Sequence, residues 1–242
     1  MSEEGLGPRL EALRTVAIQG GETPMALLDI DLTLVENAER NRAIWRDWMK
    51  TLVGRWSGAE QGALKVESMP IVFGVRENMG TLGVHEPALQ EEGFRFWLDA
   101  FFSDEYARYD EPLEGAIEAV ERLRSAGVTV AYVTARPERM APVTVECLAR
   151  FGFPIGVAGT LLVTRPKSAS SDDEAKGEAY GWLGSLGRPI LNADNEPGHV
   201  NATCIRFPDA MNVLVDTRHS PGAPGLSPEA IRVPRLLDAV LS

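Results

Sequence analysis

Two carboxylates placed two residues apart are the sharpest chemical signal in the sequence. Asp29 and Asp31 directly follow the apolar run Met25–Leu28, which is typical of a short buried strand. If the strand continues through both residues, their side chains point to the same face. Carboxylates this close repel each other unless a cation lies between them or one is protonated. The pair therefore predicts a bound Mg²⁺ and a proton-exchanging carboxyl, with Asp29 as nucleophile and Asp31 as general acid and base.

This acid pair has two other possible explanations. A polar turn after the strand is the structural alternative, because acidic turns are common. A calcium loop of the EF-hand type requires Gly at its sixth position and Glu at its twelfth. Counted from Asp29, those positions hold Leu34 and Arg40, which excludes such a loop.

Polar residues also end two later apolar segments. Thr134 closes the predicted strand Val128–Thr134, and Asp194 ends the strand-like segment PILNADN. In open parallel sheets, binding sites form just outside the carboxyl ends of the strands. We therefore expect Asp29, Asp31, Thr134 and Asp194 to converge although they lie far apart in the sequence.

The elements around these residues alternate between strand and helix. A helix is predicted from Pro112 in its first turn to Gly127 just beyond its end, and Pro137 is expected to open the next helix. The alternation predicts an α/β fold, a Rossmann-like three-layer arrangement with a largely parallel sheet. Further elements are expected as a strand at 157–163, a helix in SSDDEAKGEAYGWLGSL and a short helix near 236–241.

The segment 36–109 differs from the rest of the chain in its hydrophobic pattern and its tryptophan content. Ile44, Trp48 and Leu52 fall four residues apart, as on one face of a helix, and four of the five tryptophans lie in this segment. We therefore predict an α/β core made of residues 1–35 and 110–242, and a mainly helical insert, 36–109, with a small core of its own.

Composition limits the partners that we expect. With 24 Lys+Arg against 35 Asp+Glu, the formal net charge is −11, which disfavours non-specific nucleic-acid binding. No apolar stretch is long enough for a membrane span, and the first residues do not resemble a signal peptide. Two cysteines suggest no disulfide framework, so a cytoplasmic location is expected. The sequence predicts no oligomeric state.

Four segments, taken in chain order, resemble the motifs of the haloacid dehalogenase superfamily, in particular its phosphatases. DIDLTL (29–34) is similar to the DxDxT motif, and VAYVTAR is similar to the apolar strand that ends in Thr or Ser. Lys176 matches the helical lysine of the third motif, and Asp194 matches the acidic strand end of the fourth. The insert stands where this superfamily places a C1-type cap.

The resemblance implies a role for each matched residue. Asp29 would attack the phosphoryl group, and Asp31 would protonate the leaving oxygen and later activate water. Mg²⁺ would be held by the side chains of Asp29 and Asp194 and by the backbone carbonyl of Asp31. Thr134 would donate to a phosphoryl oxygen, and Lys176 would offset charge near Asp29. Thr33 would orient the carboxylates, and Thr33 and Arg136 are the predicted substrate contacts, with Arg136 able to clamp an anion bidentately.

Several positions leave alternatives open. Leu32 replaces a frequent Gly and is expected to be tolerated as a strand-end residue whose side chain points away. Lys167 competes with Lys176 for the third motif. Asn195 or Glu196 is expected to support the metal through a water molecule. His199 is expected to cap or pack beside a strand end, with a partnership to the metal site as the second reading.

The resemblance implies a Mg²⁺-dependent phosphomonoester hydrolase that forms an aspartyl-phosphate. Its substrate would be a small soluble phosphate ester such as a nucleotide or a sugar phosphate. Phosphonatase or dehalogenase chemistry is one alternative, although dehalogenases of this superfamily lack the second acid, which is present here as Asp31. A non-catalytic binding or regulatory protein is the other.

Overall fold

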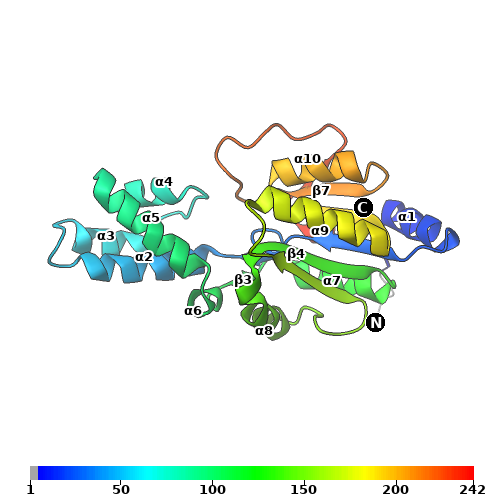
Figure 1. Cartoon of the computed structure of the whole chain (residues 1–242), viewed down its shortest axis with the longest axis horizontal. Coiled ribbons are helices and arrows are strands. Elements are labelled where there is room, and N and C mark those ends of the chain that lie inside the picture. Colours follow the sequence, from blue (N-terminus) through cyan, green and yellow to red (C-terminus); the bar gives the residue numbers. More distant parts are fainter. Residues whose placement is uncertain (1–4) are drawn as a thin grey trace. The chain divides into compact units, whose positions relative to one another are not determined.

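A six-stranded parallel sheet forms the centre of the α/β part of the chain (Figure 1). The computed structural model describes residues 5–242. The strand order is β5-β4-β1-β6-β7-β8, and all neighbouring strands run parallel. The strands are β1 (Pro24–Leu28), β4 (Thr129–Pro137), β5 (Thr160–Arg165), β6 (Arg188–Asp194), β7 (Met211–Val215) and β8 (Ile231–Val233).

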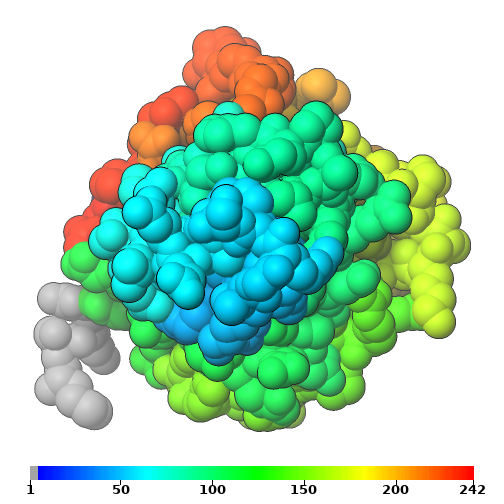
Figure 2. Space-filling model, turned by 90° about the vertical axis from the view of Figure 1, so that its left-hand side faces the viewer, coloured from blue at the N-terminus to red at the C-terminus, as the bar shows by residue number. Residues whose placement is uncertain are grey.

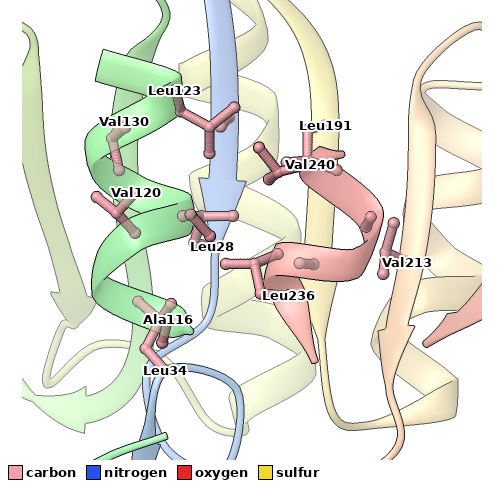
Figure 3. Close-up of a cluster of buried hydrophobic side chains, with 14 of the residues drawn as sticks. Leu28, Leu34, Ala116, Val120, Leu123, Val130, Leu191, Val213, Leu236 and Val240 are labelled. Atoms are coloured by element: carbon pink, nitrogen blue, oxygen red, sulfur yellow. The ribbon is translucent and has the colours of Figure 1, made fainter. Parts of the chain in front are cut away.

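Helices cover both faces of this sheet, which confirms the predicted α/β three-layer class. One face packs on apolar side chains of α1, α7, α8 and α11, and the close-up in Figure 3 shows α7 and α11 against β1. The other face packs on α9, through Tyr180 and Leu183, and on α10. The helices are α1 (Pro8–Gln19), α7 (Ala116–Ser125), α8 (Ala141–Phe151), α9 (Asp172–Leu186), α10 (Pro197–Arg206) and α11 (Leu236–Val240), and a 3₁₀ turn at Glu138–Met140 precedes α8.

The sheet register brings the predicted strand ends to one edge. Leu28 pairs with Tyr132 on β4 and with Ala193 on β6. Asp29 directly follows Leu28, and Asp194 directly follows Ala193, so the two aspartates lie next to each other at the carboxyl edge of the sheet. Thr134 lies two residues beyond Tyr132 at the same edge. The central position of β1 in the strand order explains why residues so distant in sequence share one edge.

Two proline assignments were wrong. Pro112 belongs to the short strand β3 (Glu111–Pro112), and α7 starts only at Ala116, after the left-handed Gly115. Pro137 ends β4 instead of opening a helix, so β4 continues three residues beyond Thr134. A fixed φ near −65° suits an edge or end of a strand as well as a first helical turn, so proline alone does not decide between them. Gly127, with φ +79°, has the left-handed backbone expected after a helix.

The chain separates into two compact units, and the second comprises Asn37–Glu111. Two short strands, β2 (Val35–Glu36) and β3, pair where the chain leaves and re-enters the sheet unit. Trp45 and Trp48 centre the core of the second unit, and a Cβ at Gly93 would come within 2.6 Å of Trp48, so a glycine is required there. Figure 2 shows the surface of this unit. Its helices are α2 (Ala38–Leu52), α3 (Ala59–Val66), α4 (Val75–Leu82), α5 (Pro87–Phe101) and α6 (Asp104–Ala107).

A buried ion pair joins the two ends of the second unit. Arg40 Nε donates to Asp110 Oδ1 at 2.7 Å, and Arg40 Nη2 donates to Asp110 Oδ2; the two side chains are 0% and 1% exposed. The guanidinium carbon lies 4.5 Å from the centre of the Phe101 ring. The pair ties the first turn of α2 to the segment after α6.

We expect Asp110→Asn to lower the free energy of unfolding by about 3 kcal/mol, because it leaves a buried guanidinium without its counter-charge. Urea denaturation of the full chain measures this. Glu92→Gln, which breaks the exposed Arg55–Glu92 pair, is the matched control and should change little. Equal losses in the two variants would contradict a special role for the buried pair.

Among residues 5–242, no helix has both the length and the apolar character that crossing a membrane requires.

Candidate active site

Three buried charged side chains meet at the carboxyl edge of the sheet. Lys176 Nζ lies 2.8 Å from Asp29 Oδ1 and 2.6 Å from Asp194 Oδ2. The exposed fractions of these side chains are 4% for Lys176, 7% for Asp29 and 5% for Asp194. The convergence of Asp29 and Asp194, which the strand-end pattern predicted, is therefore present in the structure, with a lysine between the two carboxylates.

Each of the three side chains is positioned by a regular element. Asp29 immediately follows β1, and its backbone N–H donates to the carbonyl of Ala193 on β6. Asp194 is the last residue of β6. Lys176 lies in the second turn of α9, whose first residues are acidic and whose N-cap Ser171 accepts a hydrogen bond from the Glu174 N–H.

The environment shifts the pKa values of Asp29 and Asp194 in opposite directions. Burial is the largest influence on Asp29 and, with Lys176 opposing and Asp194 adding to it, raises its pKa to about 7. Burial also acts to raise the pKa of Asp194, but Lys176 and His199 outweigh it and hold that pKa below its ordinary value. Burial opposes the charge of Lys176, yet Asp194 and Asp29 raise its pKa well above the usual range. Asp194 and Lys176 thus stay charged, whereas Asp29 changes charge near neutral pH.

His199 lies beside the end of β6, as expected, and it also contacts the buried cluster there; its partnership with a metal site stays a prediction. Its Nδ1 lies 3.2 Å from Lys176 Nζ and 3.3 Å from Asp194 Oδ2. Its Nε2 lies 2.9 Å from Oδ1 of Asp173, which the sequence analysis had not singled out. Asp173 stands in the acidic first turn of α9, and that turn is explained equally well by the helix dipole, so the sequence contained no separate signal for this contact.

The second acid of the pair has a different partner. Arg136 Nε donates to Asp31 Oδ2 at 2.7 Å, and Arg136 Nη2 donates to Asp31 Oδ1 at 2.9 Å. The Arg136 side chain is 2% exposed and that of Asp31 is 21% exposed. The bidentate geometry expected of Arg136 is thus present, but the carboxylate that it holds belongs to the protein. Its predicted contact with substrate stays a prediction.

The two threonines lie at the same edge. Thr33 Oγ1 donates to Asp29 Oδ2 at 3.1 Å, which is the contact expected of a residue that orients this carboxylate. Thr134 is buried, and its Oγ1 accepts a hydrogen bond from the backbone N–H of Arg136. Neither geometry tests the predicted contact with a phosphoryl group or another part of the substrate.

Leu32 does not behave as the strand-end residue that was expected. It occupies a turn with φ +64°, the left-handed region, and its side chain is buried. Such a backbone costs a residue with a Cβ about 1 kcal/mol, which explains why glycine suits this position. Thr217 Oγ1 donates to the Leu32 carbonyl at 2.6 Å, and Leu32 N–H donates to the carbonyl of Val35, so hydrogen bonds hold the strained turn.

Two choices were left open by the sequence: Lys176 or Lys167 for the third motif, and Asn195 or Glu196 as support for the metal. Lys176 contacts both buried carboxylates, whereas Lys167 is exposed in the loop after β5. Asn195 Nδ2 donates to the carbonyl of Arg218, and the Glu196 carboxylate accepts from Ser220 N–H and Oγ at 2.9 and 2.6 Å. Both residues after Asp194 therefore anchor the segment that follows β7, and their predicted support of a metal stays untested.

The donor set at this edge suits a magnesium ion. Within residues 5–242, no three side chains of the types His, Cys, Asp and Glu are grouped so that they could hold a metal. Asp29 and Asp194, however, converge, and a divalent cation between them would offset the repulsion of two ionised carboxylates. Mg²⁺ usually binds through one or two carboxylates and keeps several waters. Two carboxylates and the backbone carbonyl of Asp31 therefore fit this ion by chemistry.

Comparisons with solved structures show the fold of haloacid dehalogenase-like proteins, which confirms the predicted resemblance at the level of the fold. A haloacid dehalogenase-like family hydrolase from Streptococcus pneumoniae aligns at a TM-score of 0.51 with 11% identity, over 87% of this chain and 90% of that one. A Bacteroides fragilis protein named as a haloacid dehalogenase-like hydrolase aligns at 0.54 with 11% identity, over 90% and 99% of the two chains.

A third similar structure carries a different activity in its name. Protein tyrosine kinase A from Mycobacterium tuberculosis aligns at a TM-score of 0.53 with 18% identity, over 88% of this chain and 94% of that one. No family model and no curated protein matches the sequence. The fold by itself therefore does not decide the reaction, which must be argued from the site.

Proposed function

We propose that this protein is a Mg²⁺-dependent phosphomonoester hydrolase that works through an aspartyl-phosphate on Asp29. The observation that carries the proposal is the buried cluster in which Lys176 holds Asp29 and Asp194 together. Burying charges in such a cluster adds little to stability, because desolvation offsets much of the attraction, so its presence supports a functional role. Structures with this haloacid dehalogenase-like fold include proteins named as hydrolases, which supports the same reaction class.

Asp29 is the nucleophile in this proposal. Its Oδ1 accepts from Lys176 and its Oδ2 accepts from Thr33, so the carboxylate is oriented before substrate arrives. Its pKa of about 7 means that the ionised, nucleophilic form is gained as pH rises through neutrality. Lys176 stays charged and would offset the repulsion between a phosphoryl group and the carboxylate.

Asp29, Asp194 and the backbone carbonyl of Asp31 would hold Mg²⁺. When bound, this ion supplies positive charge that stabilises a phosphoryl group during transfer. Asp31 supplies a proton to the leaving oxygen and takes one from water in the second half of the reaction. Thr134 donates to a phosphoryl oxygen.

The substrate that we propose is a small soluble phosphate ester, such as a nucleotide or a sugar phosphate. The helical unit Asn37–Glu111 would act as a cap that excludes water and large polymers from the site. The acidic net charge of the whole chain supports a small substrate over a nucleic-acid polymer.

Phosphate release from p-nitrophenyl phosphate, with Mg²⁺ and with EDTA, tests the proposal. We expect turnover with Mg²⁺, loss of turnover in EDTA and recovery when Mg²⁺ is added back. Chloride release from 2-chloropropionate would instead indicate a dehalogenase, and borohydride trapping of a phosphonate substrate on a lysine would indicate a phosphonatase. Tight ligand binding by calorimetry without turnover of any substrate would indicate a binding protein.

A further inference from the structure

The Arg136–Asp31 pair joins two residues that the proposed reaction uses differently. Its two hydrogen bonds, at 2.7 and 2.9 Å, connect the turn after β1 to the last part of β4. The arginine is buried, but the carboxylate is the more exposed partner. A guanidinium that loses its hydration to hold a partly exposed carboxylate gives little net stability, because desolvation offsets much of the attraction.

Arg136 is positioned through its strand and through a contact of its guanidinium. It lies in the last part of β4, where the register is irregular, and the next residue, Pro137, pairs with Arg165 of β5. Arg136 Nη1 lies 3.4 Å from Thr144 Oγ1 on α8. The planar fork therefore presents two donors in a fixed direction, which a lysine could not do.

Asp31, by contrast, stands in a turn. The next residue is the left-handed Leu32, and the backbone of Asp31 forms an isolated bridge to Val35 instead of a continuous strand ladder. The short side chain of an aspartate in such a turn can rotate about two bonds. Each Asp31 oxygen accepts one hydrogen bond from the guanidinium fork, and the two bonds together restrict both rotations.

We propose that Arg136 is a positioning residue that holds Asp31 in the orientation needed for both of its proton transfers. The inference rests on the proposed phosphatase function. In the first transfer, the bond between phosphorus and the ester oxygen breaks as phosphorus bonds to Asp29, and the leaving oxygen takes a proton from Asp31. In the second, water attacks phosphorus, gives a proton to Asp31, and the bond to Asp29 breaks, which releases inorganic phosphate.

Leaving groups distinguish this role from a structural one. An aryl oxygen such as p-nitrophenolate leaves without much need for a proton, whereas an alkyl oxygen needs one. General acid catalysis contributes about 10²–10⁴-fold to rate. If Arg136 orients the acid, its loss must slow alkyl esters more than aryl esters, whereas a loss of folded protein slows both equally.

The experiment compares kcat/KM for p-nitrophenyl phosphate with kcat/KM for an alkyl phosphate such as phenethyl phosphate. We expect Arg136→Lys, which keeps the charge but not the fork, to raise the aryl-to-alkyl ratio at least about tenfold over the wild type. Arg165→Lys is the matched control on the adjacent strand, where the arginine pairs with Asp172, and its ratio should equal that of the wild type. An unchanged ratio in Arg136→Lys would overturn the inference.

A double-mutant cycle tests whether Arg136 acts through Asp31. In the Asp31→Asn background, Arg136→Lys should cause no further change in the ratio, and a further tenfold change there would overturn the inference. Asp31→Glu leaves the buried arginine intact but displaces the carboxyl; it should also raise the ratio, and this variant decides the matter if Arg136→Lys does not fold. Absence of all phosphatase activity in the folded wild type would refute the proposed function, and the inference with it.

Discussion

Asp29→Asn is expected to reduce phosphatase turnover at least about 10³-fold while the protein remains folded. The amide has nearly the shape of the carboxylate, and its one oxygen can still accept from Lys176 while its NH₂ group faces the Thr33 hydroxyl, but it is not a nucleophile towards phosphorus. Steady-state hydrolysis of p-nitrophenyl phosphate with Mg²⁺ measures the effect. Turnover within tenfold of the wild type would remove Asp29 as the nucleophile.

The same substitution should stabilise the metal-free protein at alkaline pH. The pKa of Asp29 is raised to about 7 from 3.8, so between these values the folded state binds more protons than the unfolded state. The stability of the wild type therefore falls as pH rises through this window, by an amount on the order of a few kcal/mol. Asp29→Asn lacks this loss.

Urea denaturation in EDTA at pH 8 and pH 4 measures this effect. The variant should be more stable than the wild type at pH 8, and the difference should shrink towards pH 4. A variant that is less stable than the wild type at pH 8 would show that the charged Asp29 contributes favourably to the fold, contrary to this account. If Asp29→Asn loses activity but gains stability, Asp29 has a catalytic role and not a structural one.

Lys176→Met is the second substitution with a large expected effect, because it removes the one cation between two buried carboxylates. We expect a loss of about 3–5 kcal/mol in the free energy of unfolding at pH 8 and little phosphatase activity. Without the lysine, the pKa values of Asp29 and Asp194 rise in the folded state, so the destabilisation should be smaller at pH 5 than at pH 8.

Lys167→Met is the matched control for this variant. Lys167 is exposed, so its replacement should change the free energy of unfolding by no more than about 0.5 kcal/mol and should leave activity near that of the wild type. Thermal melts and the p-nitrophenyl phosphate assay on both variants provide the comparison. The reverse ranking of the two lysines would contradict the assignment of Lys176.

Most of the candidate site could be predicted from the sequence, because sites in parallel sheets form outside the carboxyl ends of the strands. Asp29, Thr134 and Asp194 each interrupt or end an apolar run, and the register of β1 with β4 and β6 brings those ends together. Lys176 came only from the resemblance to a family. A lysine in the middle of a helix has no local signal of burial, and its contacts depend on how α9 packs on the sheet.

The contacts that sequence reasoning missed depend on tertiary structure. The partner of Arg136 is Asp31, 105 residues earlier in the chain. The contacts of His199 depend on α10 lying beside α9, and the segment of α10 carried no helical prediction. Leu32 adopts a left-handed turn although leucine has no preference for one, because hydrogen bonds from Thr217 and to Val35 hold it there.

Local ambiguity explains the errors in the fold. Pro112 and Pro137 were assigned to helix starts and lie in or at the end of strands, since the same fixed φ suits both. Helix α1 was not predicted, because its apolar residues do not keep to one face and only Leu10 and Ala17 are buried. The helices of the insert were easier to predict, because α2 repeats apolar residues at helical spacing.

Trapping of the phosphorylated enzyme tests whether Asp29 forms the covalent intermediate. The Asp31→Asn variant, which should accumulate the intermediate, is mixed with p-nitrophenyl phosphate and Mg²⁺, quenched in acid and digested, and its peptides are analysed by mass spectrometry. We expect the added mass of one phosphoryl group on the peptide containing Asp29, and none when Asp29→Asn is also present. A phosphoryl group on another residue such as His199 would contradict the role of Asp29 as nucleophile. Turnover by a variant in which Asp29 is never phosphorylated would contradict it as well.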